Sequence, residues 1–237
     1  MIVAAEDTPI NRNAVLYSNL GSPELSAPDE YLIDPATSAG TLVRVDRDGE
    51  IIAQGDKAGY CFQITSGCVR AVKLIEGGRR QVGEFLFARD IFGWEALSEH
   101  EFAVEAVTPV VLRRFRLSTI EEFAANDRLF ARKLQRYIVA KVQTGRAHLV
   151  LLGRKTAAER ISSFLLEMLG RPSGCTTSAL DLPMSRADIA DYLGLTIETV
   201  CRELRNLHRR GVIVIRRGRI VISDHRALRS DGSVWLH

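Results

Sequence analysis

The stretch MSRADIADYLGLTIETVCRELRNLHRRGVIVIRRGRIVI, Met184 to Ile222, decides the architecture of the C-terminal part of the chain. Ser185, with an aspartate three residues later, forms a capping box that starts a short helix. Gly194 stands where the end of that helix needs a left-handed residue, and Thr196 is an N-cap for a second helix over 197–209. Two helices joined by a tight glycine turn predict a helix-turn-helix motif.

The second predicted helix has two chemically different faces. Its apolar side chains, which can pack against the first helix, are Val200, Leu204 and Leu207. Three other side chains, Cys201, Arg202 and Arg205, lie within about 60° of Glu198 on the opposite face, at about 100° per residue. In the first turns of an exposed helix, arginine can pair with guanine, and glutamate can accept from cytosine, in a DNA major groove. This face is therefore a candidate for base reading.

Two short strands around the turn Arg217-Gly218 are predicted after the second helix, as a basic wing. Residues 205–219 hold six arginines and no acidic residue, and residues 153–237 carry 14 Lys and Arg against 9 Asp and Glu. Such a segment attracts polyanions through counterion release. The candidates for contacts with the DNA backbone are Ser185, Thr196, Thr199, Arg205, Arg216, Arg217 and Arg219. A helix pair and hairpin that merely pack together are the alternative, but caps, polar face and wing all agree with binding to double-stranded DNA.

The preceding part of the chain has a different texture. Residues 1–40 are rich in Pro, Ser, Asn and Ala without a sustained period and are expected to form a loosely ordered N-terminal arm. Residues 41–117 consist of short β-rich runs separated by glycine turns, at the spacing of an antiparallel barrel or sandwich. A helical segment over 118–152 follows, and we place the boundary to a C-terminal domain over 153–237 near Gly153.

A short helix and then a long one are predicted over 118–152. Apolar residues of the long helix recur every three or four positions: Phe130, Leu134, Ile138, Val142, Gly145, Leu149 and Leu152. This seam is longer than a small domain needs, and a partner helix is its natural cover. The alternative is a helix packed entirely on its own β domain. We favour a homodimer interface, because Val139 and Val150 widen the apolar surface beyond one stripe.

The composition excludes several other classes of protein. The chain has 237 residues, 46% of them hydrophobic and 26% charged, which is typical of a soluble globular protein. No apolar run approaches the ~20 residues that span a bilayer, so we expect a cytoplasmic protein with no membrane partner. Its four cysteines stand apart, without metal-ligand spacing, and no catalytic triad or phosphate loop is present. We therefore predict neither an enzyme nor a metal site.

The motif LGLTIETVCREL, the long helix before it and the glycine-punctuated β domain together resemble the CRP/FNR superfamily of bacterial transcription regulators. The resemblance covers residues 40–223. It implies an α+β fold in which a β-roll of the cyclic-nucleotide-binding type (a jelly roll), a long dimerisation helix and a winged helix-turn-helix follow one another. It also implies a homodimer that contacts RNA polymerase, for which the loop after Leu169 is a candidate. Residues that match base-reading positions are Ile197, Glu198, Cys201 and Arg202. An apolar residue before the glutamate, here Ile197, resembles the pattern of the FNR-type branch, whose palindromes have TTGAT-like half-sites.

Departures from the family patterns indicate how the protein is controlled. Cyclic-AMP-binding members hold the phosphate with an Arg-Ser pair, but His100-Glu101 stands there, and no arginine lies between Asp90 and Val111. Iron–sulfur members need an N-terminal cysteine cluster, whereas residues 1–60 contain no cysteine. The chain thus resembles the FixK-type branch, which works without either cofactor and activates microaerobic respiration and nitrogen-fixation genes. A regulator with an unidentified effector in the β-roll is the alternative, and a purely protein-binding dimer is a third.

Cys201 is a candidate for redox sensing. It lies in the second turn of the predicted base-reading helix, next to Arg202 and one turn from Arg205. Positive charge of this kind favours the thiolate and hence its oxidation. An oxidised, negatively charged cysteine would then weaken binding to DNA phosphates. The alternative, a small residue chosen because DNA approaches closely, stays open.

Overall fold

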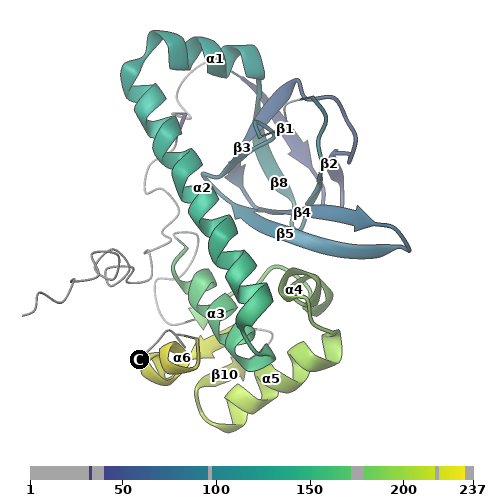
Figure 1. Cartoon of the computed structure of the whole chain (residues 1–237), viewed down its shortest axis with the longest axis vertical. Helices are drawn as coiled ribbons and strands as arrows, with labels where there is room; N and C mark the ends of the chain where they lie inside the picture. The colour runs from purple at the N-terminus through teal and green to yellow at the C-terminus, as the bar shows by residue number, and fades with distance from the viewer. Residues whose placement is uncertain (1–31, 34–39, 96–97, 172–178, 217–218, 233–237) are drawn as a thin grey trace, which may run out of the picture.

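The protein is described by a computed structural model over residues 32–33, 40–95, 98–171, 179–216 and 219–232. Its β domain contains β1 (Thr41–Val45), β2 (Glu50–Ile52), β3 (Tyr60–Ser66), β4 (Cys68–Ile75), β5 (Arg79–Phe87), β6 (Ile91–Phe92), β7 (Ala103–Ala106) and β8 (Val110–Arg116). They form two antiparallel four-stranded sheets, in the orders β1-β8-β3-β6 and β2-β7-β4-β5. Figure 1 shows these sheets facing each other in the upper half of the molecule. The predicted antiparallel β-roll is confirmed.

Alternating apolar residues close the β domain over its own core. Phe62 on β3 and Phe92 on β6 stack with ring centroids 5.2 Å apart, and Leu112 and Leu86 are fully buried beside them. The turn between β3 and β4 depends on Gly67, whose φ is +96°. A Cβ at this position would lie 2.6 Å from the carbonyl oxygen of Pro109, so only glycine fits the turn.

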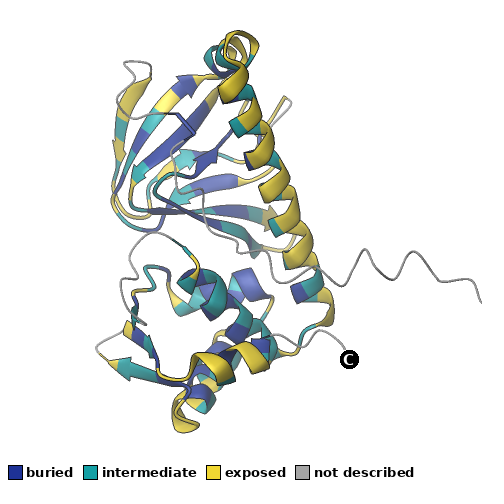
Figure 2. Ribbon diagram, turned by 90° about the vertical axis from the view of Figure 1, so that its left-hand side faces the viewer, coloured by how far each residue is buried: buried dark blue, intermediate teal, exposed yellow. Residues whose placement is uncertain are grey.

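Three helices follow: α1 (Leu117–Asn126), α2 (Arg128–Arg154) and α3 (Ala157–Leu169). The carboxylate of Asp127 starts α2 by accepting from the backbone N–H groups of Leu129 and Phe130 at 2.8 and 3.1 Å. Helix α2 then runs along the β domain, and its outer side is exposed over most of its length (Figure 2). It passes Gly153 without a break, so the expected boundary falls in its last turn.

The C-terminal part contains β9 (Ala179–Leu180), α4 (Arg186–Leu193), α5 (Ile197–Arg209), β10 (Ile213–Arg216), β11 (Arg219–Ile222) and α6 (His225–Gly232). The helix starts and the turn are as predicted: Ser185 forms both halves of a capping box, Gly194 has φ 59° and ψ 43°, and Thr196 caps α5. Strand β9, which pairs with β11, and helix α6, which packs on α3, were not predicted. The winged helix-turn-helix is confirmed.

The β domain and the helix-turn-helix share one apolar core. Phe85 of β5 lies with its ring 5.3 Å from that of Tyr192 on α4 and 6.4 Å from that of Phe164 on α3. All three side chains belong to a single buried cluster that also holds Val82. The C-terminal part is therefore seated on the face of the β4–β5 hairpin. Of the expected arm, Leu32 and Ile33 are buried against the β domain, and its other residues up to 39 lie outside the described residues.

Candidate DNA-binding surface

Helix α5 is fixed to the rest of the molecule by one face. Val200, Leu204 and Leu207 are buried in the same cluster as Ile189 and Leu193 of α4. The predicted packing of the two helices is therefore confirmed. Because the apolar face is used in this way, the opposite face of α5 is left to solvent.

The predicted base-reading side chains lie together on that outer face. Glu198, Arg202 and Arg205 are exposed, Cys201 between them is half-buried, and Ile197 at the start of the helix is 47% exposed. The guanidinium of Arg202 pairs with the carboxylate of Glu203 at 3.1 Å, in a solvent-exposed contact that a stronger partner can replace. Arg205 donates to the carbonyl oxygen of Cys201 at 3.2 Å.

Glu198 is held in its charged form. The backbone N–H of Glu198 itself and, to a lesser extent, the hydroxyl of Thr196 lower the pKa of its carboxyl below the ordinary value. An ionised glutamate is purely an acceptor. It can therefore receive a hydrogen bond from an exposed base amino group, such as that of cytosine.

In the structure, the hydroxyls that were expected to bind phosphates take part in capping α4 and α5. Thr196 accepts from the N–H of Thr199 at 3.2 Å and donates to the hydroxyl of Thr199 at 3.1 Å. Ser185 donates to the carboxylate of Asp188 at 2.7 Å. Contacts from these residues to DNA stay a prediction, for which the N–H groups at the helix starts offer additional donors.

The basic wing presents its charges to solvent. Arg216 is exposed at the end of β10, and the side chain of Arg219 at the start of β11 is 66% exposed, with only a 3.4 Å contact to the equally exposed Asp181. Arg217 lies outside the described residues. Exposed guanidiniums beside α5 can contact phosphates and add to counterion release.

The expected dimer seam divides between two faces of α2. Val142 and Leu149 are 49% and 71% exposed, Gly145 is also exposed, and Ile138 is half-buried. These side chains lie on one side of the helix and are available to a partner. Leu134 and Leu152 are partly buried against their own chain.

Phe130 does not belong to the exposed seam and corrects the prediction. It is 8% exposed and lies in the core beneath α1, with its ring 5.7 Å from that of Phe123. Tyr137, one heptad on, lies on the same buried face, and its hydroxyl bonds both the N–H and the C=O of Ile91 at 2.9 Å. The step of three to four residues could not separate these two faces, because both carry apolar residues.

Arg160 on α3 was not predicted to matter. Its guanidinium donates to the carbonyl oxygens of Leu152 and Leu193 at 2.8 Å and of Lys155 at 2.9 Å. These carbonyls end α2 and α4, where helices leave C=O groups without partners. One side chain thus ties the long helix to the turn before α5. An arginine in an amphipathic helix gives no sequence signal for such a role.

The described cysteines differ in accessibility. Cys61 and Cys68 are buried, and burial raises the pKa of both thiols to about 12, which keeps them protonated and unreactive. Cys201 is half-exposed on the outer face of α5. Cys175 lies outside the described residues. In the described part of the chain, no three His, Cys, Asp or Glu side chains come together as a metal site would require.

The segment that matches the phosphate-binding segment of cyclic-AMP receptors is built differently here. His100 is buried, and its backbone pairs with that of Gly55 and Asp56. The Glu101 side chain is 80% exposed and pairs with Lys73 at 3.2 Å. His100 and Glu101 thus stand where the resemblance to cyclic-AMP-binding members would place an Arg-Ser pair.

An exposed acid–arginine edge on a capped helix, a basic wing and a β-roll define a DNA-binding transcription regulator. Family models agree: residues 42–127 match the cyclic nucleotide-binding domain, and residues 159–230 match the Crp-like helix-turn-helix domain. The chain belongs to the CRP/FNR family and is not an enzyme.

Relatives within this family include FixK proteins. The chain is 38% identical to the nitrogen fixation regulation protein FixK of Azorhizobium caulinodans, over 95% of this chain and 91% of that protein. It is also 38% identical to FixK of Rhizobium meliloti, over 91% and 99%. The solved structure of FixK2 from Bradyrhizobium japonicum superposes with a TM-score of 0.78 at 37% identity, covering 84% of this chain and all of that one. Within the described residues, no helix is long and apolar enough to cross a membrane.

Proposed function

We propose that the protein is a homodimer that reads a palindrome with TTGAT-like half-sites through α5. The outer face of that helix carries the proposal, because Ile197, Glu198 and Arg202 project from its first two turns. Arg202 would pair with a guanine and Glu198 with a cytosine, while the exposed Ile197 suits the methyl group of thymine. Arg205 and the wing would hold the phosphates on either side.

The outer side of α2 supports the proposed dimer. Val142 and Leu149 are large, apolar and exposed on a helix of 27 residues. A second copy of the same helix, packed in parallel, would cover them and place the two α5 helices symmetrically. Two recognition helices related by twofold symmetry would each bind one half-site, which is why a palindromic site is expected.

Selection of binding duplexes from a random pool tests the proposal. The expected product is a palindrome with guanine in each half-site, bound by a dimer in sedimentation analysis. Arg202→Ala should relax the preference at one position per half-site. Arg229→Ala, which removes an exposed arginine from α6, should leave the selected sequence unchanged. Recovery of a non-palindromic or random pool would contradict the proposal.

The input and output of the regulator are also proposed. FixK relatives are described as regulators of nitrogen fixation, and we propose that this chain activates microaerobic respiration or nitrogen-fixation genes through RNA polymerase. It would do so without cyclic nucleotide, because Glu101 replaces the donor that a cyclic phosphate needs. It would also do so without an iron–sulfur cluster, because residues 1–60 contain no cysteine. Calorimetry with cyclic AMP should show no binding heat. Saturable binding that raises operator affinity would instead favour a ligand-responsive regulator.

Oxidation of Cys201 is proposed as a direct control of DNA binding. Hydrogen peroxide would transfer one oxygen to the thiolate, giving a sulfenic acid and hydroxide, and a second peroxide would oxidise the sulfenic acid to a charged sulfinate, with release of water and a proton. On the outer face of α5 this charge would oppose the DNA phosphates. Peroxide should reduce operator binding of the wild type and spare Cys201→Ser. Equal sensitivity of both proteins would contradict the proposal, whose failure leaves the DNA-reading proposal intact.

A further inference from the structure

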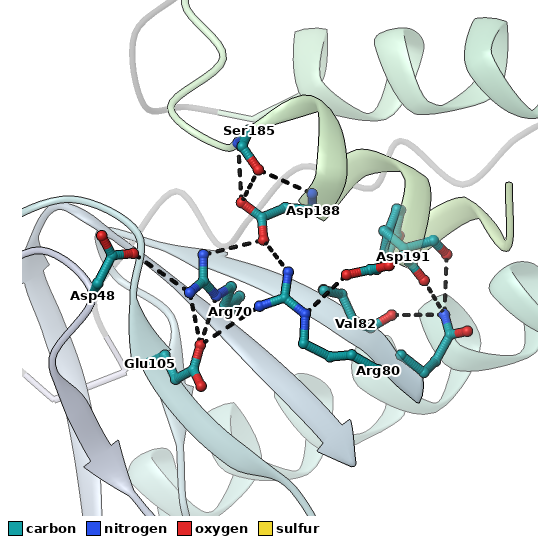
Figure 3. A network of polar contacts seen from close by, with 10 residues as sticks. Asp48, Arg70, Arg80, Val82, Glu105, Ser185, Asp188 and Asp191 are labelled. Atoms are coloured by element: carbon teal, nitrogen blue, oxygen red, sulfur yellow. Dashed lines mark hydrogen bonds and ion pairs between the residues drawn. The ribbon is translucent and has the colours of Figure 1, made fainter. Parts of the chain in front are cut away.

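Two arginines of the β domain clasp the first helix of the helix-turn-helix (Figure 3). Arg80 on β5 bonds Asp188 at 2.7 Å and Asp191 at 2.8 Å, both on α4. Arg70 on β4 bonds the same oxygen of Asp188 at 3.1 Å. These four side chains are called the interdomain latch. It joins strands and helix that are more than 100 residues apart in the chain.

Asp188 has two duties that occupy both of its oxygens. One oxygen completes the capping box by accepting from the N–H and hydroxyl of Ser185 at 3.0 and 2.7 Å. The other accepts from the two latch arginines. Its side chain is only 3% exposed. The group that starts α4 is therefore also the group that fastens α4 to the β domain.

The arginines are held in place from behind. Glu105 on β7 pairs with Arg70 at 2.7 Å and lies 4.0 Å from Arg80, and Asp48 adds a 3.4 Å contact to Arg70. The side chain of Arg70 is 11% exposed. Preorganised guanidiniums of this kind lose little entropy on docking and present a fixed geometry to their partners.

Beneath the latch, the apolar contact of Phe85 with Tyr192 holds α4 against β5 but, because the hydrophobic effect is non-directional, does little to fix the orientation of α4. Partly buried ion pairs contribute modestly to net stability, yet they can specify one arrangement among several. A second contact between Arg171 and Asp90, at 3.0 Å, anchors the end of α3 to the β domain. Gln81 of β5 also donates to the backbone C=O groups of Asp191 and Tyr192, at 2.5 and 3.4 Å. With these contacts and the shared core in place, loss of the latch would leave the C-terminal part attached but with its orientation less tightly fixed.

We propose that the interdomain latch positions the recognition helix for DNA. It fixes α4 relative to the β domain and hence to the dimer axis. Helix α5 is fixed with it, because Leu193 of α4 and Val200 of α5 lie in one buried cluster. Figure 1 shows α4 between the β domain and α5, so the latch grips the motif on the side away from the exposed reading face of α5. Two recognition helices must be set about one DNA turn apart, ~34 Å, to read two half-sites. This inference rests on the proposed dimeric reading of a palindrome.

Operator affinity of Arg80→Glu tests the inference. The substitution breaks both contacts of Arg80 and places a carboxylate against Asp188 and Asp191. Arg79→Glu is the matched control, because Arg79 is exposed beside it on β5 and the change in charge is the same. We expect Arg80→Glu to weaken binding to the selected palindrome by about tenfold or more, and Arg79→Glu by less than threefold. Asp191→Arg added to Arg80→Glu should recover at least threefold of the loss.

Three outcomes would overturn the inference. Unchanged affinity of Arg80→Glu would show that orientation does not depend on the latch. Tighter binding would show that the latch restrains the helix instead of positioning it. Equal losses in both variants would reduce the effect to bulk charge. If Arg80→Glu does not fold, as judged by circular dichroism, Arg80→Gln serves in the same comparison, with a smaller expected loss of about threefold.

Amide hydrogen exchange provides a readout that needs no DNA. In Arg80→Glu, amides of α4 should exchange faster than in the wild type, while those in the β domain keep their protection. Unchanged exchange in α4 would overturn the inference. Faster exchange in α4, in a protein that selects no palindrome, would instead mean that the latch exists and the proposed reading of DNA has failed.

Discussion

Replacement of Arg160 by alanine should destabilise the protein far more than the same replacement of Arg154 at the end of α2. Its guanidinium serves three helix-end carbonyls at 2.8 to 2.9 Å. A hydrogen bond to a charged group is worth about 1.5–3 kcal/mol net. Arg160 is half-buried, so water can replace part of what is lost. We therefore expect a loss of about 2–4 kcal/mol in the free energy of unfolding.

Urea denaturation followed by circular dichroism measures this loss. Arg154→Ala is the control, because Arg154 is exposed in the last turn of α2 and carries the same charge. It should cost less than ~0.5 kcal/mol. Arg160→Lys should fall between the two, since one ammonium cannot reach three carbonyls with the same geometry. A loss for Arg160→Ala no larger than that for Arg154→Ala would show that the three carbonyl contacts do not stabilise the fold.

The other predictions concern the shared core, the latch and the long helix. Phe85→Ala should cost about 3–5 kcal/mol in urea denaturation because it opens a cavity in the core, whereas Phe102→Ala, at a 37% exposed position, should cost far less. Burial alone would raise the pKa of Asp188, but Ser185 and the latch arginines hold it below its ordinary value. The stabilisation by the Asp188 carboxylate is therefore present above the pKa of the unfolded state and is lost as the pH falls through the pKa of the folded state. Asp188→Asn should consequently lose less stability between pH 5 and 3 than the wild type. Leu149→Glu should dissociate the dimer in sedimentation equilibrium without unfolding the protein, and Phe130→Ala should destabilise the fold by about 3–5 kcal/mol. If Leu149→Glu unfolded the protein and Phe130→Ala dissociated the dimer, the assignment of these residues to two faces of α2 would be wrong.

Local signals in the sequence predicted the helix-turn-helix well. These signals act over a few residues, so they can be recognised from the sequence alone. They are the capping boxes, the glycine turn and the spacing of Val200, Leu204 and Leu207. The same holds for the β-roll, whose glycine turns mark the strand ends. The exposed set of Glu198, Arg202 and Arg205 follows from that local geometry, and the structure places it as expected.

The features that sequence did not predict depend on residues far apart in the chain. Strand β9 is two residues long and exists because β11 offers it an edge. Arg70 and Arg80 look like ordinary exposed charges of β-strands until α4 is placed against them. Phe130 has the spacing of the dimer seam, yet the contact with Phe123 draws it into the core. Only the tertiary arrangement separates such cases.

The proposed function depends above all on Arg202 reading a base from the outer face of α5. The most direct test measures the affinity of wild type and Arg202→Ala for the selected palindrome and for duplexes in which each guanine pair is replaced in turn. We expect a loss of about 1–3 kcal/mol for Arg202→Ala, with discrimination abolished at one guanine and kept at the other positions. A loss of the same size on every duplex, with all discrimination retained, would contradict it, because Arg202 would then contact only phosphate.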